Sequence, residues 1–303
     1  MNYFKHITLS LFFFLSITSL TAQANCEKFE SLKQAFKEEN IESVCELDLS
    51  DQNLKELPDN IGNLPNLEIL RLENNRLKSL PDSIIKSKKI LRLHLDFNQF
   101  ESVPEPILKL EKLEKLSMNN NFLKDLPQSI GNLKTLKYMS FMNNQLSTVP
   151  RQIGKLKKLM FLNLISNELT ELPAELFSIP LLENLYLGSN EKLKIPNDIY
   201  EMKKLTRLSL SGTALEKISP DIKNLKNLKW LSVSSNKIEK LPDEICELKE
   251  LEALFIGYTN ITKLPAQFEE LKKLKKISLS DLDLGSIKET EIRNSFPEAE
   301  IEF

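Results

Sequence analysis

The sequence has few of the residues from which catalytic and metal centres are usually built. Its 303 residues include two histidines, three cysteines and seven glycines. Outside the N-terminal segment the single histidine is His94, so a Ser-His or Cys-His pair has one partner to draw on. HExxH and paired CxxC zinc motifs are absent, and so is a glycine-rich phosphate loop. We therefore expect no enzyme activity and no cofactor.

Neither basic nor acidic residues are in clear excess. The 41 Lys and Arg residues nearly balance the 43 Asp and Glu residues, which gives a formal net charge of −2. No basic stripe runs along the sequence, so nucleic acid is not an expected partner. After the N-terminal segment there is no apolar run of the roughly 18 residues that a membrane-spanning helix needs, so no transmembrane segment is expected.

Residues 1–24 have the pattern of a secretory signal peptide. Lys5 supplies a positive charge, Ile7 to Leu20 form a short apolar run, and residues 22–24 fit an A-x-A cleavage site. The pattern predicts an exported protein that is secreted, periplasmic or associated with the cell surface. Two alternatives stay open. One is an uncleaved anchor, although the run is short for a span; the other is a lipid on Cys26, although the residues before it are a poor lipidation signal.

What the sequence does contain is a pattern of 23 residues, repeated along most of the chain. In residues 113–135, apolar side chains stand at positions 1, 4, 6, 11, 14, 18 and 21 of the pattern. Position 1 recurs every 23 residues from Val44 to Leu274 without insertion or deletion. Positions 4 to 6 alternate between apolar and polar, which indicates a strand. Such a short strand cannot bury its inner face alone, so neighbouring repeats must stack into a solenoid.

Asparagine and proline also recur at fixed positions. Asparagine at position 9 can satisfy buried backbone groups where the chain leaves the strand. Proline at position 15 suits a return segment too short for a full helix, where we expect turns and 3₁₀ pieces. The seventh and eighth repeats depart from the pattern at Lys192 and Ser219, and we expect local distortion there. The position-9 asparagines are Asn75, Asn98, Asn121, Asn144, Asn167, Asn190 and Asn236.

The repeats divide the chain into an array and two caps. Apolar residues with helical spacing predict an N-terminal helical cap over residues 25–43. Ten 23-residue repeats follow over residues 44–273. Residues 274–303 are predicted to hold a partial eleventh repeat and a C-terminal cap, with a helix beginning at Ser286 and a final strand at the end of the chain.

The cysteines fit an exported protein. Cys26 lies 19 residues before Cys45, and the two flank the N-terminal cap. In an oxidising compartment we expect them to form a disulfide, which at this loop length would stabilise the fold by about 3 kcal/mol. Cys246 stands alone and is expected to be a half-buried free thiol.

The consensus LxxLxLxxNxLxxLPxxIxxLxx resembles the 23-residue class of leucine-rich repeats. That class occurs in Ras-pathway scaffold proteins and in many exported bacterial proteins, and the signal peptide and short caps make this chain most similar to the bacterial group. The resemblance implies an α/β solenoid. This is a right-handed horseshoe with a parallel sheet on the concave face and short turns or 3₁₀ segments on the convex face. It also implies partner binding on the concave face and no catalysis.

The repeat count predicts eleven parallel strands, and at about 4.8 Å between strands the concave sheet would extend on the order of 50 Å. Positions 3, 5 and 7 of each repeat are expected to face the concave side, because the core positions are already filled by Leu, Ile, Met and Val. The early strands carry charged residues at these positions. The later strands carry aromatic and apolar residues among serines and asparagines.

Aromatic residues amid small polar ones have the composition of a protein-binding surface, so we predict a protein or peptide partner from a host or a cell surface. Aromatic rings also stack on sugars, which makes a glycan or cell-surface polysaccharide the alternative. The predicted partner-binding residues are Tyr138, Met142, Phe161, Ile165, Tyr186, Trp230, Phe255 and Tyr258.

One group of charged residues has the chemistry of a metal site. Glu73, His94 and Asp96 are expected on neighbouring strands of the concave face, and such side chains ligate divalent cations. Arg71 and Arg92 share the patch, however, and cross-strand ion pairing accounts for these charges without a metal. A structural zinc site has four protein ligands, so the three residues are a weak candidate and no metal is predicted.

Overall fold

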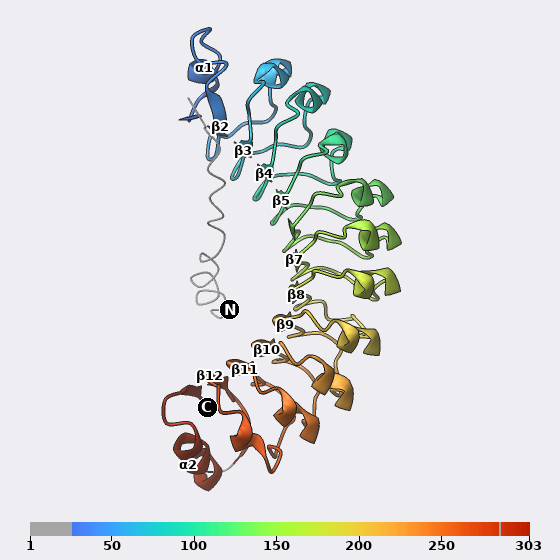
Figure 1. Ribbon diagram of the computed structural model, residues 1–303, viewed down its shortest axis with the longest axis vertical. Helices are drawn as coiled ribbons and strands as arrows, with labels where there is room; N and C mark the ends of the chain where they lie inside the picture. The colour runs from blue at the N-terminus through green and yellow to red at the C-terminus, as the bar shows by residue number, and fades with distance from the viewer. Residues whose placement is uncertain (1–25, 285) are drawn as a thin grey trace.

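The computed structural model describes residues 26–284 and 286–303 of the chain. The predicted signal peptide, residues 1–24, lies outside the described residues. The described part forms an open, curved solenoid in which the strands line the inner side of the arc and the short helices its outer side (Figure 1). This is the horseshoe that the repeat pattern predicts.

Within the described residues, thirteen parallel strands form one sheet in the order of the chain. Neighbouring strands pair with a shift of one repeat, so that Leu93 lies opposite Leu116 and Leu116 opposite Met139. The constant repeat length produces this register, because an insertion of one residue would turn the apolar side chains to the other face. The strands are β1 (Glu27–Phe29), β2 (Val44–Asp48), β3 (Ile69–Arg71), β4 (Arg92–His94), β5 (Lys115–Ser117), β6 (Tyr138–Ser140), β7 (Phe161–Asn163), β8 (Asn184–Tyr186), β9 (Arg207–Ser209), β10 (Trp230–Ser232), β11 (Ala253–Phe255), β12 (Lys276–Ser278) and β13 (Glu300–Glu302).

Each return segment on the convex side contains a short 3₁₀ helix, as the sequence predicted. A proline precedes most of these helices, for example Pro127 with φ −70° before η5. Proline suits this place because its φ is already set and its missing N–H costs nothing where no sheet bond is formed. The helices are η2 (Asp59–Asn63), η3 (Asp82–Lys86), η4 (Glu105–Lys109), η5 (Gln128–Asn132), η6 (Arg151–Lys155), η7 (Ala174–Ser178), η8 (Asn197–Glu201), η9 (Pro220–Asn224), η10 (Asp243–Glu247) and η11 (Phe268–Glu270).

The apolar positions form one continuous core between the sheet and the 3₁₀ helices. Leu116 and Ile130 of the fourth repeat have no exposed surface. Asn121 connects this repeat to the one before it. Its Oδ1 accepts a hydrogen bond from the backbone N–H of Phe100 at 3.1 Å, and its Nδ2 donates one to the carbonyl of Leu95 at 3.0 Å. The position-9 asparagines therefore satisfy buried backbone groups, as expected.

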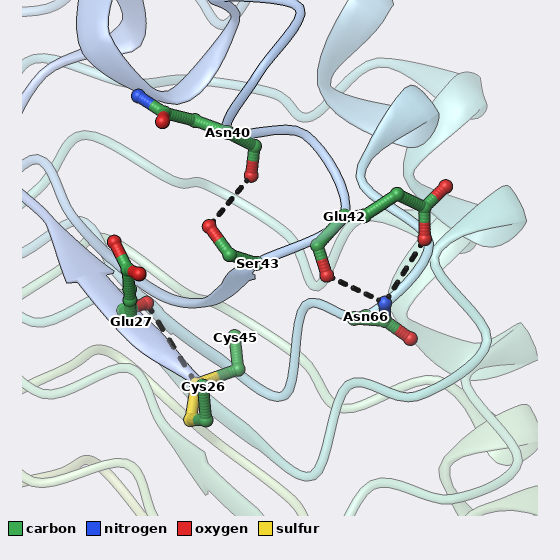
Figure 2. The surroundings of a disulfide bond; sticks show 7 residues. All are labelled: Cys26, Glu27, Asn40, Glu42, Ser43, Cys45 and Asn66. Atoms are coloured by element: carbon green, nitrogen blue, oxygen red, sulfur yellow. Dashed lines mark hydrogen bonds between the residues drawn. A yellow bond between two sulfur atoms is a disulfide. The ribbon is translucent and has the colours of Figure 1, made fainter. Parts of the chain in front are cut away.

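The N-terminal cap differs from the prediction of a helix across residues 25–43. It begins with β1, which pairs with β2, and helix α1 (Leu32–Ala35) has only four residues. A strand at this end supplies backbone partners to β2, which a helix over the core could not do. Cys26 and Cys45 are joined by a disulfide that connects the start of β1 to β2, as the sequence predicts (Figure 2).

The C-terminal cap consists of helix α2 (Ser286–Ser295) and strand β13, which pairs with β12. Phe296, just after α2, packs against Phe268 with ring centroids 5.6 Å apart, so the cap covers the end of the core. The predicted helix start and final strand are both found. The predicted number of eleven strands is wrong, because each cap adds a strand to the sheet.

The two irregular repeats keep the sheet intact. In the seventh repeat Leu193, one residue after Lys192, fills the core position and is fully buried. In the eighth, the Ser219 hydroxyl accepts a hydrogen bond from the N–H of Asp221 and caps η9. The changes are therefore absorbed in the return segments, and β8, β9 and β10 stay in register.

Cys246 of η10 is a free thiol, but it is buried instead of half-buried. The same position is glycine in several other repeats, where the next repeat packs closely: a Cβ added to Gly131 would lie 2.6 Å from the carbonyl oxygen of Gln152. In the repeat of η10 this position is covered, and Cys246 is 3% exposed. Burial raises the pKa of the Cys246 thiol to about 11.

Candidate functional site

The strands turn their odd-numbered positions toward the concave face. In β6, Met139 at position 4 is fully buried in the core, while Tyr138 at position 3 is half-buried on the concave side. Most position-5 residues of the central strands are small, and most are buried in the floor of that face, such as Ser140 and Ser232. The larger side chains at position 3 stand on this floor. Two sets of residues on the concave face differ in character: one is aromatic and the other is charged.

Five aromatic side chains form a continuous series on the concave face, which we call the aromatic ladder: Tyr138, Phe161, Tyr186, Trp230 and Phe255. Ring centroids are 4.2 Å apart between Tyr138 and Phe161, whose planes are nearly parallel at 11°. The following pairs are 5.3, 6.0 and 5.3 Å apart and tilted. The series runs from β6 to β11 and crosses β9, which has no ring of its own. The ladder therefore behaves as one packed surface and not as scattered hydrophobic residues.

The ladder contains five of the eight residues predicted to bind a partner. The other three lie beyond the strands: Met142 and Ile165 are half-buried at position 7, and Tyr258 is 40% exposed at position 8. Tyr258 has a φ of +55°, a left-handed backbone conformation that the fold imposes at this position in every repeat. The structure thus separates a packed central series from three flanking apolar side chains.

Two cations beside the ladder were not among the predicted site residues. The ammonium of Lys115 lies 4.7 Å from the centre of the Tyr138 ring, a cation–π contact at the first end of the ladder. Arg207 on β9 hydrogen-bonds Tyr186, and its charge opposes the burial that raises the pKa of that phenol. Both residues are at position 3, so listing the cations at that position would have identified them.

Burial keeps the tyrosines of the ladder neutral. It raises the pKa of Tyr138 to about 12, and it raises the pKa of Tyr186 as well. Both hydroxyls are therefore protonated at physiological pH and can donate hydrogen bonds.

The floor beneath the ladder is hydrogen-bonded within itself. The Ser140 hydroxyl donates to Oδ1 of Asn119 at 2.6 Å, and the N–H of Met142 donates to the same oxygen at 2.7 Å. Further along, the hydroxyls of Ser211 and Ser232 are hydrogen-bonded to each other. Because these short side chains satisfy one another, they hold the rings on a fixed base.

The other set of concave residues belongs to β2, β3 and β4, which we call the charged strands. Their side chains pair across neighbouring strands: Nε of Arg71 lies 2.9 Å from Oε1 of Glu46, and Nζ of Lys28 lies 3.0 Å from Oδ2 of Asp48. Nδ1 of His94 lies 3.4 Å from a Glu73 oxygen. The charged strands therefore neutralise most of their charge internally.

The weak metal candidate lies among these residues. Glu73, His94 and Asp96 each offer a ligand atom, and these atoms are within 4.8 Å of one another. Burial lowers the pKa of His94 to about 3, so its imidazole is neutral. Yet Glu73 accepts a hydrogen bond from the Ser50 hydroxyl at 2.9 Å. Asp96 accepts one from the Ser117 hydroxyl, which lies near both of its oxygens, and one from the N–H of Asn119 at 2.6 Å. The carboxylates are already engaged, so cross-strand pairing accounts for the cluster and we assign no metal to it.

Family comparisons identify the repeat. A family model described as a leucine-rich repeat region matches residues 8–128 and 124–218, and one described as a leucine rich repeat matches residues 226–284. The chain belongs to the leucine-rich repeat family. Both descriptions concern the repeat, and neither names an enzyme. A comparison with curated proteins finds no match.

Solved structures show where this leucine-rich repeat fold recurs. A leucine-rich repeat protein of Leptospira interrogans is 27% identical over 91% of this chain and 100% of that one, with a TM-score of 0.49. The ectodomain of the plant receptor kinase GASSHO1/SCHENGEN3 from Arabidopsis thaliana is 29% identical over 80% of this chain, with a TM-score of 0.64. An internalin of Listeria monocytogenes is 20% identical over 88% of this chain and 82% of that one, with a TM-score of 0.70.

The match covers 33% of the plant ectodomain, so the leucine-rich repeat chain corresponds to a part of that receptor only. Across the residues that the structure describes, this leucine-rich repeat protein contains no helix with the length and apolar character of a membrane span.

Proposed function

We propose that this protein is an exported, non-enzymatic recognition protein that binds a protein or peptide partner along the aromatic ladder. The observation that carries the proposal is the packing of five aromatic rings into one series on the concave face, in which four rings are half-buried and Tyr186 is buried. Most protein interfaces draw their binding energy from a few such aromatic anchors surrounded by polar residues. The ladder supplies the anchors, and the serines and asparagines of the floor supply the polar surroundings.

A solved relative supports binding of this kind. The Arabidopsis receptor ectodomain that is 29% identical to this chain was solved in complex with Casparian strip integrity factor 2. A leucine-rich repeat ectodomain similar to this chain therefore binds a partner. We infer the same class of activity here, with a partner from a host or a cell surface.

Export rests on the predicted signal peptide over residues 1–24 and is supported by the disulfide between Cys26 and Cys45. Disulfides of this kind form in oxidising compartments and are rare in the cytosol. A secreted, periplasmic or surface-associated protein would meet its partner outside the cytoplasm.

A glycan is the second candidate, and the ring geometry favours a protein over it. Sugars stack on the open face of an aromatic ring. One face of Tyr138 is covered by the parallel ring of Phe161, and the Lys115 ammonium also lies over the Tyr138 ring. The Tyr138 ring therefore has less open face available to a sugar, which favours a polypeptide at this end of the ladder.

The test is a pull-down of surface and host proteins with the mature chain and with a Phe161→Ala, Trp230→Ala double variant. We expect the double variant to keep its circular dichroism spectrum and to lose the specific partner, with at least a tenfold drop in affinity. Ile69→Ala is the matched control, because Ile69 is a half-buried apolar residue at position 3 of a charged strand. If the double variant retains every partner, the ladder is not the site. If soluble glycans displace the partner, the glycan candidate replaces the protein one.

A further inference from the structure

At positions 3, 5 and 7, the concave face around the ladder contains no carboxylate. From the repeat of β5 to that of β11, none of the residues at positions 3, 5 and 7 is Asp or Glu, although the chain has 43 acidic residues. The carboxylates that face the concave side are concentrated on the charged strands and on β13. Acidic residues are therefore excluded from the surface that we propose to bind the partner.

The same surface holds cations without a carboxylate partner. Among the described residues, no carboxylate lies within 4.0 Å of Lys115, Arg207 or Arg92. Other cations on this face are paired, for example Lys276, whose Nζ is 2.9 Å from Glu300. The cations without a carboxylate partner at position 3 therefore lie on β4, β5 and β9, at the first end of the ladder and within it.

Lys115 occupies an electrostatically unfavourable place in the free protein. It lies directly opposite Arg92 in the register of β4 and β5, and like charges in this arrangement repel. Burial lowers the pKa of Lys115, and the positive charge of Arg92 lowers it further. A partially desolvated cation beside a second cation gains stabilisation from an incoming anion.

Arg207 lies beside a shallow hollow at the other half of the ladder. The hollow has a volume of about 370 Å³ and is lined by Trp230, by the small side chain of Ala253 and by three lysines. Its one carboxylate, Glu252, is already paired with Lys275 at 3.3 Å and with Lys229 at 3.5 Å. The hollow therefore combines an indole, an exposed guanidinium and an excess of positive charge.

We propose that the partner is an acidic polypeptide segment, and that its carboxylates bind at Lys115 and at Arg207 while apolar side chains between them contact the ladder. This proposal rests on the proposed function, because it assigns a partner class to the same surface. Lys115 is on β5 and Arg207 on β9, so four strand spacings of about 4.8 Å separate them by roughly 19 Å. An extended peptide covers that distance in about six residues.

The spacing also distinguishes a peptide from a polyanion. Nucleic acid and sulfated polysaccharides carry a charge at each step of the chain and bind continuous basic surfaces. Here the positive charge is interrupted, because three aromatic residues lie between Lys115 and Arg207: Tyr138, Phe161 and Tyr186. Two acidic residues separated by an apolar stretch match this pattern.

The test uses a displayed library of random 12-residue peptides selected on the mature chain. We expect the selected peptides to be enriched in Asp and Glu flanking apolar residues. Replacing those residues of the best peptide by Asn and Gln should lower its affinity at least tenfold. A Lys115→Gln, Arg207→Gln variant should bind the acidic and amidated peptides equally. Lys28→Gln is the matched control, because this cation belongs to the same sheet but lies on β1, away from the hollow, and is already paired with Asp48 at 3.0 Å, and it should keep the acidic preference.

The outcomes separate the two proposals. Peptides that bind only the wild type and not the Phe161→Ala, Trp230→Ala variant, but show no acidic preference, would overturn the acidic partner and leave the proposed function standing. A selection whose binders are unaffected by the ladder variant would overturn the proposed function itself. Dextran sulfate is the polyanion probe: if it displaces the peptides and depends on Lys115 and Arg207, a polyanion replaces the acidic peptide.

Discussion

The charged strands β2 to β4 and the aromatic strands β6 to β11 share one scaffold and differ almost entirely on one face. Their core positions, their 3₁₀ return segments and their register are the same. On the concave face, the charged strands pair acids with bases across neighbouring strands. The aromatic strands place rings there, and cations without a carboxylate partner lie on β9 and on the adjacent β5.

Under the proposed function, the core positions of each repeat serve stability, and the concave positions of the central repeats serve binding. A charge that is already neutralised by its neighbour gains little from a partner, because the new contact must replace the old one. Packed rings beside unpaired cations have both apolar surface and charge left to satisfy. The charged strands therefore satisfy most of their charges within the chain, whereas the centre of the concave face has apolar surface and positive charge available to a partner.

The largest loss of stability should come from substitutions in the core, where we expect the charged strands and the aromatic strands to respond alike. Leu93 of β4 and Leu208 of β9 are both fully buried at position 4 between two neighbouring strands. We expect Leu93→Ala and Leu208→Ala each to lower the free energy of unfolding by about 3 kcal/mol, through lost burial and the cavity left behind. Urea denaturation followed by circular dichroism measures this. Effects that differ by more than about 1.5 kcal/mol would mean that the two regions do not share one scaffold energetically.

Much of this scaffold could be predicted from the sequence, because the repeat imposes it at every step. The spacing of Leu116 and Met118 predicted the strands, and Pro127 and its counterparts predicted the 3₁₀ helices. Cap strand β1 could not be predicted in this way. It occurs once, has three residues, and forms because β2 would otherwise leave its edge unpaired.

The candidate site was predictable only in part. Reading positions 3, 5 and 7 identified the rings of the ladder, since each points to the concave side by alternation. The contact between Tyr186 and Trp230 was not predictable, because it crosses the strand between them and depends on how far the two side chains extend. The roles of Lys115 and Arg207 also depend on which carboxylates lie near them, and that information comes from the folded chain.

A substitution of intermediate effect should change how the free energy of unfolding depends on pH, and it concerns the charged strands alone. Burial lowers the pKa of His94 on β4 to about 3, and the positive charges of Lys115, Arg71 and Arg92 act in the same direction. The negative charge of Asp48 opposes this shift but does not outweigh it. The unfolded chain, with a pKa of about 6.5, therefore binds the proton more readily than the folded one. Stability from this residue is complete above pH 6.5 and is lost as the pH falls toward 3.

We expect His94→Gln to remove a component of about 2 kcal/mol from the difference in unfolding free energy between pH 7 and pH 5. Comparing urea unfolding of the wild type and the variant at both pH values isolates this residue from the carboxylates, which the two proteins share. An equal pH dependence in both proteins would contradict the neutral, buried imidazole. Because His94 belongs to the charged strands, we expect partner affinity measured at pH 7 to stay the same.

The smallest change in stability concerns a single ion pair. It separates the two regions because stability and peptide affinity should respond in opposite ways. Arg71 and Glu46 are about one-third and one-quarter exposed, with their charged atoms 2.9 Å apart. Partly exposed pairs contribute little, so Glu46→Gln should lower the free energy of unfolding by about 0.5 kcal/mol, and less at high salt. Peptide affinity should not change, because the pair lies on the charged strands.

Lys115→Gln should do the reverse. It removes a cation that repels Arg92 and has no carboxylate within 4.0 Å, so stability is kept while affinity for acidic peptides falls. If Glu46→Gln weakens peptide binding as much as Lys115→Gln, the charged strands belong to the binding surface and the division between the two regions fails.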